Sequence, residues 1–463
     1  MSENKTESND IEKIAEESRL NKPLTVKFLL AFTLPTIASY VIMSLFGTVD
    51  GVFASRGISA QALSAIMFVD PFFAFTMAIG AMLTMGGSAL VAKKKGEKKD
   101  REARENFTFI ILVTFAVSIL MSVAGWLVRV SLLRLLGTDT EVFDLATAYL
   151  QPLIIIIPFI MVGIILVQFM IAEGRPVLGM LASGMGAVIS TSLNALFILV
   201  LDMGIFGLAL ATGIGYAAPA LMGVIYFSIN RKGTIYFVRP KWDIKVLGRS
   251  SYNGISEMVT MMAATVMTLV LNNVMVRIVG WEGVATAGIV FAAQGIFSSV
   301  FFGYAAGIVP VVSYNFGGKN KENLKILYRK SLLIIAVLST AALIGTVISA
   351  DLLALIYVSP NDPIVGHLHT MAVWGLRITA IRFILMGFNV FATAWFTAFN
   401  DGMISGIMSF MRTAVFSLTL FLTLPRIWGL NGVWIALPGA EVLSIFVTVF
   451  FLIKMGKKYF YRA

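Results

Sequence analysis

The chain has no cysteine and only two histidines, His367 and His369, which lie in one short segment. Without cysteine it has no disulfide, no thiolate metal ligand and no cysteine nucleophile. Two neighbouring histidines are also too few for most metal centres and do not suggest a Ser-His-Asp triad. The sequence therefore predicts a protein that is not an enzyme and that holds no metal or organic cofactor.

Charged residues are scarce as well. They make up 13% of the chain, against 58% hydrophobic residues, and the mean hydropathy is +0.87. Such a composition lies outside the range of soluble proteins and predicts an integral protein of the lipid bilayer. The net charge of +11 is what basic cytoplasmic loops give a membrane protein, so we expect no nucleic-acid partner.

Apolar runs separated by polar residues, glycine or proline predict twelve transmembrane helices, and the fold class is all-α integral membrane. The first 27 residues are polar, and the apolar run after them is too long for a signal peptide, so we expect a retained tail or interfacial helix. The predicted spans are 28–54, 62–92, 106–128, 147–171, 177–201, 204–229, 252–279, 285–314, 329–350, 367–398, 403–424 and 429–453.

Lysine and arginine are distributed unequally between the two sides of these spans. One side, which includes both terminal tails, carries 28 of the 36, the other side carries 5, and 3 lie within spans. Because cytoplasmic loops are enriched in basic residues, both termini should be cytoplasmic. We expect a multi-pass protein of the plasma membrane.

An internal repeat appears when the first half of the sequence is set over the second with a shift of 222 to 223 residues. Residues 48–57 then lie over 272–280, and 95–98 over 317–320. Two six-helix repeats enter the membrane in the same direction, so ligand is expected between or within two lobes. The predicted parts are a cytoplasmic tail 1–27, an N-lobe 28–230, a cytoplasmic linker 231–251, a C-lobe 252–454 and a cytoplasmic tail 455–463.

Ionisable residues within the spans are candidate site residues because each costs about 2.5 to 3.5 kcal/mol at the centre of a membrane helix. Asp50 and Asp70 both lie about 10 Å below the outer surface at 1.5 Å per residue. They could share one site, where a proton, sodium or an organic cation would relieve their repulsion. Alternatively Asp70, which precedes Pro71, only caps a helix start. Asn194 reaches a similar depth and either orients a carboxylate or makes a helix-helix hydrogen bond.

The second lobe holds a further set of charged candidates. Arg412 and Glu441 lie near the middle of the last two spans, where a structural ion pair is the favoured interpretation. Glu257 lies near the inner start of the seventh span and either caps that helix or takes part in ion coupling. Arg377 and Arg382 either extend toward the membrane surface or neutralise these carboxylates.

Four motifs spread along the chain carry a family resemblance. They are Leu34-Pro35 through Thr48-Val49-Asp50 with Gly57, Ala62-Leu63-Ser64-Ala65 and Pro71; Gln168-Phe169 with Gly174 and Pro176; Asp202-Met203-Gly204 with Gly207 and Ala209-Leu210-Ala211-Thr212; and Gly432 to Pro438 with Glu441. In these motifs and in its twelve spans the chain resembles the multidrug and toxic compound extrusion (MATE) family. The resemblance implies a monomeric antiporter that moves small amphipathic, often cationic, organic molecules outward in exchange for inward H⁺ or Na⁺.

Two departures from the family pattern bear on the coupling residues. The resemblance leans toward the branch named for DNA-damage-inducible protein F, which uses an acid on the first helix, here Asp50. Many members also have an Asp four residues after an Asn on the fifth helix, but here Asn194 follows Ser190. The tenth helix has Asn389 in place of the acid of the norfloxacin-efflux branch. Asp70 or Glu257 could substitute, or Asp50 could work alone.

The candidate ion-coupling and substrate-binding residues are therefore Asp50, Asp70, Gln168, Asn194, Glu257, Asn389, Arg412 and Glu441. An alternative function is a flippase for lipid-linked precursors, whose pyrophosphate would need cations such as Arg377, Arg382 and Arg412; another is a narrow-substrate exporter of the same superfamily. An intramembrane enzyme lacks a visible nucleophile and base, and a receptor would leave the repeat unexplained.

Overall fold

The computed structural model describes residues 23–135, 140–231, 233–357, 366–459 and 461, and these form helices and connecting turns without any strand. The all-helical prediction is confirmed. The helices are α2 Val26–Val52, η2 Phe53–Ile58, α3 Ala60–Gly96, α4 Asp100–Leu135, α5 Thr140–Ala172, α6 Pro176–Asn194, η3 Ala195–Val200, α7 Gly204–Ile229, α8 Ile244–Ile278, α9 Trp281–Gly317, α10 Lys321–Tyr357, α11 Gly366–Ala380, α12 Phe383–Ala398, α13 Gly402–Phe410, η4 Met411–Phe416 and α14 Ser417–Met455.

Several helices extend beyond the predicted spans. The apolar run of α8 suggests a start at residue 252, yet the helix begins at Ile244, where the side chain of Asp243 accepts a hydrogen bond from the backbone N–H of Lys245. Hydropathy detects only the part of a helix that lies inside the bilayer, so it does not predict polar helical turns outside the bilayer. The α7 helix, which is apolar up to both ends, has the predicted bounds of 204–229.

The last two spans are joined in α14, where the chain reverses direction. Gly429 has φ 55° and ψ −133°, which breaks the helix. A Cβ atom on Gly439 would lie 3.0 Å from Cδ1 of Leu420, although these residues would be about 28 Å apart along a straight helix. The segments before and after Gly429 are therefore antiparallel neighbours. Together with α11 and α12, which form one span bent by 54°, they account for the tenth to twelfth spans.

Three short π-helical segments interrupt the regular helices at candidate site residues. The segment η2 follows Asp50 by three residues, η3 follows Asn194 directly, and η4 contains Arg412. A π-helical turn widens the backbone and occurs often at functional sites.

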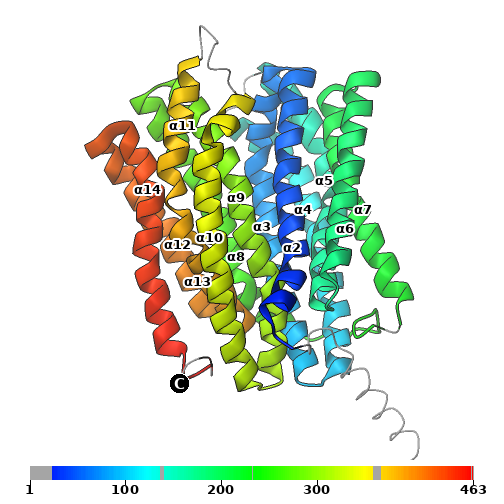
Figure 1. Cartoon of the computed structure of the whole chain (residues 1–463). Coiled ribbons are helices and arrows are strands. Elements are labelled where there is room, and N and C mark those ends of the chain that lie inside the picture. Colours follow the sequence, from blue (N-terminus) through cyan, green and yellow to red (C-terminus); the bar gives the residue numbers. More distant parts are fainter. Residues whose placement is uncertain (1–22, 136–139, 232, 358–365, 460, 462–463) are drawn as a thin grey trace, which may run out of the picture.

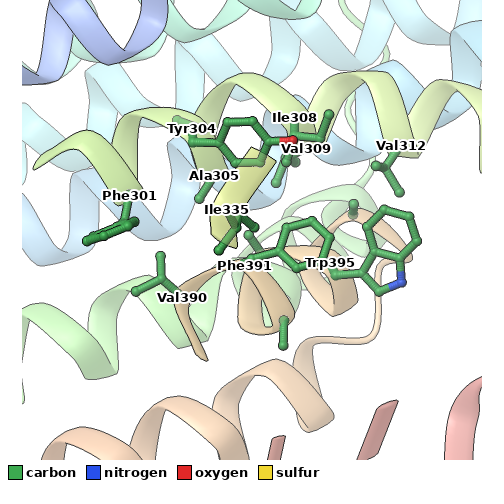
Figure 2. Packing of buried hydrophobic residues seen from close by; sticks show 14 of the residues in the cluster. Phe301, Tyr304, Ala305, Ile308, Val309, Val312, Ile335, Val390, Phe391 and Trp395 are labelled. Carbon is green, nitrogen blue, oxygen red and sulfur yellow. The ribbon is translucent and has the colours of Figure 1, made fainter. Parts of the chain in front are cut away.

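The first six spans, α2 to α7, lie beside the last six, α8 to α14, and the start of α2 and the end of α14 lie at the same end of the bundle (Figure 1). The largest apolar cluster belongs mainly to the second half. There Phe391 and Trp395 of α12 pack near Tyr304 of α9, with Val309 and Ile335 completing the contact (Figure 2). This packing holds α9, α10 and α12 together as one unit.

The two halves approach each other most closely at the end that holds both described termini, which we call the closed end. A Cβ on Gly86 of α3 would lie 1.9 Å from the carbonyl oxygen of Ser250 on α8, and one on Gly96 would lie 1.8 Å from that of Tyr314 on α9. Toward the other end, the corresponding space beside Gly47 on α2 and Gly288 on α9 holds no atom within 4 Å. The halves therefore touch backbone to backbone at the closed end, whereas Gly47 and Gly288 have open space beside them.

The described residues of the segment that joins the halves, 230–231 and 233–243, pack against the first half at the closed end. The guanidinium of Arg104 donates hydrogen bonds to the hydroxyl of Tyr236, at 2.7 Å, and to the carbonyl oxygen of Thr234, at 3.1 Å. Close by, the hydroxyl of Tyr226 donates to the buried carboxylate of Glu173, at 2.7 Å. Burial raises the pKa of Glu173, while Tyr226 and Lys95 oppose that shift.

Candidate functional site

Asp50 lies near the end of α2 and is buried among polar side chains of two other helices. Nδ2 of Asn194 on α6 donates to its Oδ1 at 2.6 Å. Oγ1 of Thr212 on α7 lies 2.9 Å from its Oδ2 and also 2.9 Å from the carbonyl oxygen of Leu208, so the hydroxyl proton has two acceptors. Both carboxylate oxygens thus face neutral donors, and the structure brings the predicted pair Asp50 and Asn194 together.

The hydrogen-bonding capacity of this site is not filled. Asn194 is fully buried, and within the described part of the chain its Oδ1 has no hydrogen-bond partner; the same holds for Oγ of Ser190 on the same helix. Among the described residues, Asp50 has no basic side chain within 4 Å of its carboxylate. The site therefore combines an uncompensated negative charge with a spare acceptor, which is a combination that suits a cation or a proton.

Tyrosines surround the site, and one of them relates it to Asp70. Tyr149 and Tyr216 both lie close enough to interact electrostatically with Asp50, and Tyr149 does so with Asp70 as well. The side chain of Asp70 itself is exposed and takes no part in the hydrogen bonds of Asp50. The structure places Asp70 outside this hydrogen-bonded group.

A second buried polar group is centred on Glu441 of α14. Nδ2 of Asn389 donates to its Oε2 at 2.8 Å and to its main-chain oxygen at 3.1 Å. Arg382 and Arg412 each approach its Oε1 to 3.7 Å. Thr448 donates to Oδ1 of Asn389 at 2.7 Å, which fixes the orientation of the amide. The predicted pair of Arg412 and Glu441 is present, and Arg382 and Asn389 join it.

Arg377 takes no part in this group. It forms an exposed ion pair with Asp351, 2.7 Å from Nη2 to Oδ2, near the end of the bundle opposite the closed end. Of the two arginines that the sequence offered for the buried carboxylates, Arg382 neutralises Glu441 and Arg377 does not.

Glu257 lies well inside α8, which begins at Ile244, so the suggestion that it caps a helix start is wrong. It lines a cavity of about 40 Å³ between the two halves, room for two or three water molecules. Tyr40 and Met85 of the first half close the cavity, and Arg412 lines it from η4. Glu257 is thus a predicted carboxylate that faces a cavity.

Gln168 of α5 is buried and connects the two halves. Its Nε2 donates to the carbonyl oxygen of Ala306 on α9, at 3.1 Å. The glutamine that the family motif singled out therefore joins the halves and lies outside both polar groups.

Sequence reasoning missed Thr212, Gln294 and the tyrosines near Asp50. A hydroxyl on an apolar helix is no rarity, since it can bond to its own backbone as Thr212 does to Leu208. Its position in the sequence could have indicated it: Thr212 is the last residue of the motif that begins at Asp202 and lies on the helix after the one that carries Asn194.

Comparisons with known proteins agree with this architecture. The MatE family model matches residues 35–196 and 258–422, which is more than half of the chain. Multidrug export protein MepA of Staphylococcus haemolyticus is 24% identical over 433 residues, covering 93% of this chain and 94% of the relative. The protein of the same name from Staphylococcus saprophyticus is 26% identical over 430 residues, covering 91% and 92%.

Solved structures share the fold. A crystal structure of MATE in complex with MaL6 superposes with a TM-score of 0.89 at 20% identity, covering 95% of this chain and 98% of the other. A multidrug resistance MATE family transporter of the MOP superfamily, solved in an outward-facing conformation, gives a TM-score of 0.88 at 19% identity, covering 96% and 98%. By its family match, its helical membrane fold and its relatives, the chain belongs to the MatE family, whose members are membrane transporters and not enzymes.

Proposed function

We propose that this transporter is a secondary active exporter that moves small amphipathic, often cationic, organic compounds out of the cell in exchange for inward H⁺ or Na⁺. The observation that carries the proposal is the Asp50 carboxylate, which is buried, held by neutral donors and not paired with a basic side chain. Its negative charge therefore has to be balanced by a cation that binds and leaves during transport. The staphylococcal relatives named as multidrug export proteins support the substrate class.

In this mechanism the organic cation and the coupling ion compete for one charge. Ionised Asp50 holds the organic cation when the site faces the cytoplasm. When the site faces outward, H⁺ or Na⁺ binds to Asp50 and the organic cation leaves. Because two competing ligands weaken each other's affinity equally, binding of the coupling ion favours release of the organic cation. An inward-moving monovalent ion gains about 2.3 kcal/mol per 100 mV of membrane potential, and an outward-moving monovalent organic cation loses the same amount, so a one-for-one exchange is driven by the concentration gradient of the coupling ion.

The close contacts at the closed end support an orientation for the site in this conformation. With both termini cytoplasmic, as the lysine and arginine distribution predicts, the closed end faces the cytoplasm and the conformation is outward-facing. Asp50 lies toward the end of α2 where the neighbouring Gly47 and Gly51 face open space, so ions from outside would reach it in this state. We further propose a plasma-membrane monomer of the branch named for DNA-damage-inducible protein F.

A flippase for lipid-linked precursors is less well supported. It needs guanidinium groups that face a pyrophosphate, but Arg377 pairs with Asp351, and Arg382 and Arg412 both lie against Glu441. Engaged cations are poor candidates for a phosphate site.

The deciding experiment is ethidium efflux from energised vesicles, with proton and sodium gradients imposed separately. Wild type should export ethidium under at least one gradient, and Asp50→Asn should lose that export. Asp144→Asn, the same change at an exposed position of α5, is the matched control and should transport normally. A folded wild type that moves no ethidium under either gradient would contradict the proposal and favour a narrow-substrate exporter.

A further inference from the structure

The cavity between the halves contains two opposite charges that do not touch. Glu257 enters it from α8 and Arg412 from η4, near the hydroxyl-bearing side chains of Thr260 and Thr393. Arg412 interacts electrostatically with Glu257. Among the described residues, neither a hydrogen bond nor an ion pair within 4 Å joins Glu257 to another side chain. The carboxylate therefore faces Arg412 across a space of water size.

Arg412 is the guanidinium that remains to balance Glu257. Glu441 already receives the amide of Asn389, at 2.8 Å, and Arg382 lies against it at 3.7 Å. Arg382 is fixed further by Gln294, whose Oε1 accepts from its Nη1 at 3.0 Å. Arg412 lies at the same 3.7 Å from Glu441 and is 6% exposed, but among the described residues its guanidinium, unlike that of Arg382, donates no side-chain hydrogen bond. Its charge is thus shared between the two carboxylates.

Without Arg412 the cavity would have the features of a monovalent-cation site. It offers a carboxylate and hydroxyl oxygens, the ligands that hard cations prefer, in a space that admits a small ion. The guanidinium supplies the positive charge there and repels a second one.

We propose that Arg412 is a tethered cation that fills this cavity's cation role, so that external sodium does not bind at Glu257. Asp50 then remains the site for the exchanged ion, and Arg412 is a residue that determines ion specificity. This consequence for transport rests on the proposed function, whereas the sodium exclusion itself can be measured without any transport.

The test is thermal unfolding of purified protein in detergent, with sodium chloride compared with N-methylglucamine chloride at constant ionic strength. All variants carry Asp50→Asn, which removes the first site. In this background we expect no sodium-specific rise in Tm. Adding Arg412→Gln should create one, at sodium concentrations that leave the Tm of the parent unchanged. Adding Glu257→Gln as well should abolish it, and Arg412→Lys, which keeps the charge, should not produce it.

Two results would overturn the proposal. One is a sodium-specific rise in Tm in the Asp50→Asn protein that Glu257→Gln removes, since sodium would then bind beside Arg412. The other is a folded Asp50→Asn, Arg412→Gln protein that does not respond to sodium. If that protein does not fold, the comparison of Asp50→Asn with and without Glu257→Gln, in which Arg412 is intact, still tests the proposal. A wild type that does not export ethidium would contradict the proposed function, but the sodium-dependent changes in Tm would still test the role of Arg412.

Discussion

The side-chain amide of Asn194 joins α6 to α2 by donating to Asp50, with 2.6 Å between Nδ2 and Oδ1. A second carboxylate at this position would repel Asp50, and a lysine would cancel its charge. A neutral amide stabilises the ionised form and leaves the charge available to a ligand. The departure from the family pattern at this position is therefore compatible with a single-carboxylate site.

Removing the amide should favour the neutral form of Asp50. A hydrogen bond to a charged group contributes about 1.5 to 3 kcal/mol, so Asn194→Ala should strengthen proton binding by about tenfold or more. Tetraphenylphosphonium should then bind about tenfold more weakly at pH 6, and much of that loss should disappear at pH 8, where protons compete less. Equal weakening at both pH values would show that Asn194 contacts the organic cation itself.

A bulky residue at the closed end should force the halves apart there. A Cβ on Gly86 already would collide with the backbone of Ser250, so Gly86→Leu should shift the population toward a cytoplasm-open state and slow export at least about tenfold. Because the chain has no cysteine, single cysteines near residue 250 can report the opening by maleimide labelling without background. Gly248→Leu is the control, since nothing lies within 4 Å of that position. Unchanged labelling in folded Gly86→Leu would count against the closed-end assignment.

The Glu441 group should matter for stability. Glu441→Gln leaves Arg382 and Arg412 without their shared carboxylate, and breaking a buried pair costs about 3 to 5 kcal/mol. Asp351→Asn breaks the exposed pair with Arg377 and should cost less than about 1 kcal/mol. Thermal unfolding in one detergent measures both. Similar losses in the two variants would mean that the buried group is not structural.

Stability should also depend on pH through Glu173, which lies outside the spans. Because burial raises its pKa in the folded protein, the folded state holds this proton in a pH range where the unfolded state has lost it. The group's contribution to stability is present below the unfolded pKa, about 4.3, and is lost as pH rises through the folded pKa. The unfolding free energy of wild type relative to Glu173→Gln should therefore increase as pH falls from 7 toward 5. The exposed Glu322→Gln variant should show no such trend.

The sequence predicted what depends on hydropathy and residue type. Twelve apolar spans, the absence of strands, and the buried positions of Asp50, Asn194 and Glu441 are all readable along the chain, because charge and amide groups are costly in a membrane helix. The start of α8 could not be predicted in this way, because its first turns are polar. For that reason the position of Glu257 well inside the helix was not predicted either.

Partners across helices were less predictable. The choice of arginine that neutralises Glu441 depends on helix rotation and on the bend between α11 and α12. Neither property can be inferred from the sequence. Asp70 shows the same limit, because equal depth in the membrane does not bring two carboxylates onto facing sides of their helices.

The close backbone contacts of the closed end also bear on leakage. Gly86 and Gly254 lie against backbone atoms of the opposite half, so no mobile side chain stands between the halves at these points. A coupled exporter loses its driving gradient whenever a continuous file of water connects the two sides of the membrane. Backbone packed on backbone leaves no rotamer that could open such a file, so at these points the barrier to ions can be lost only when the halves themselves part.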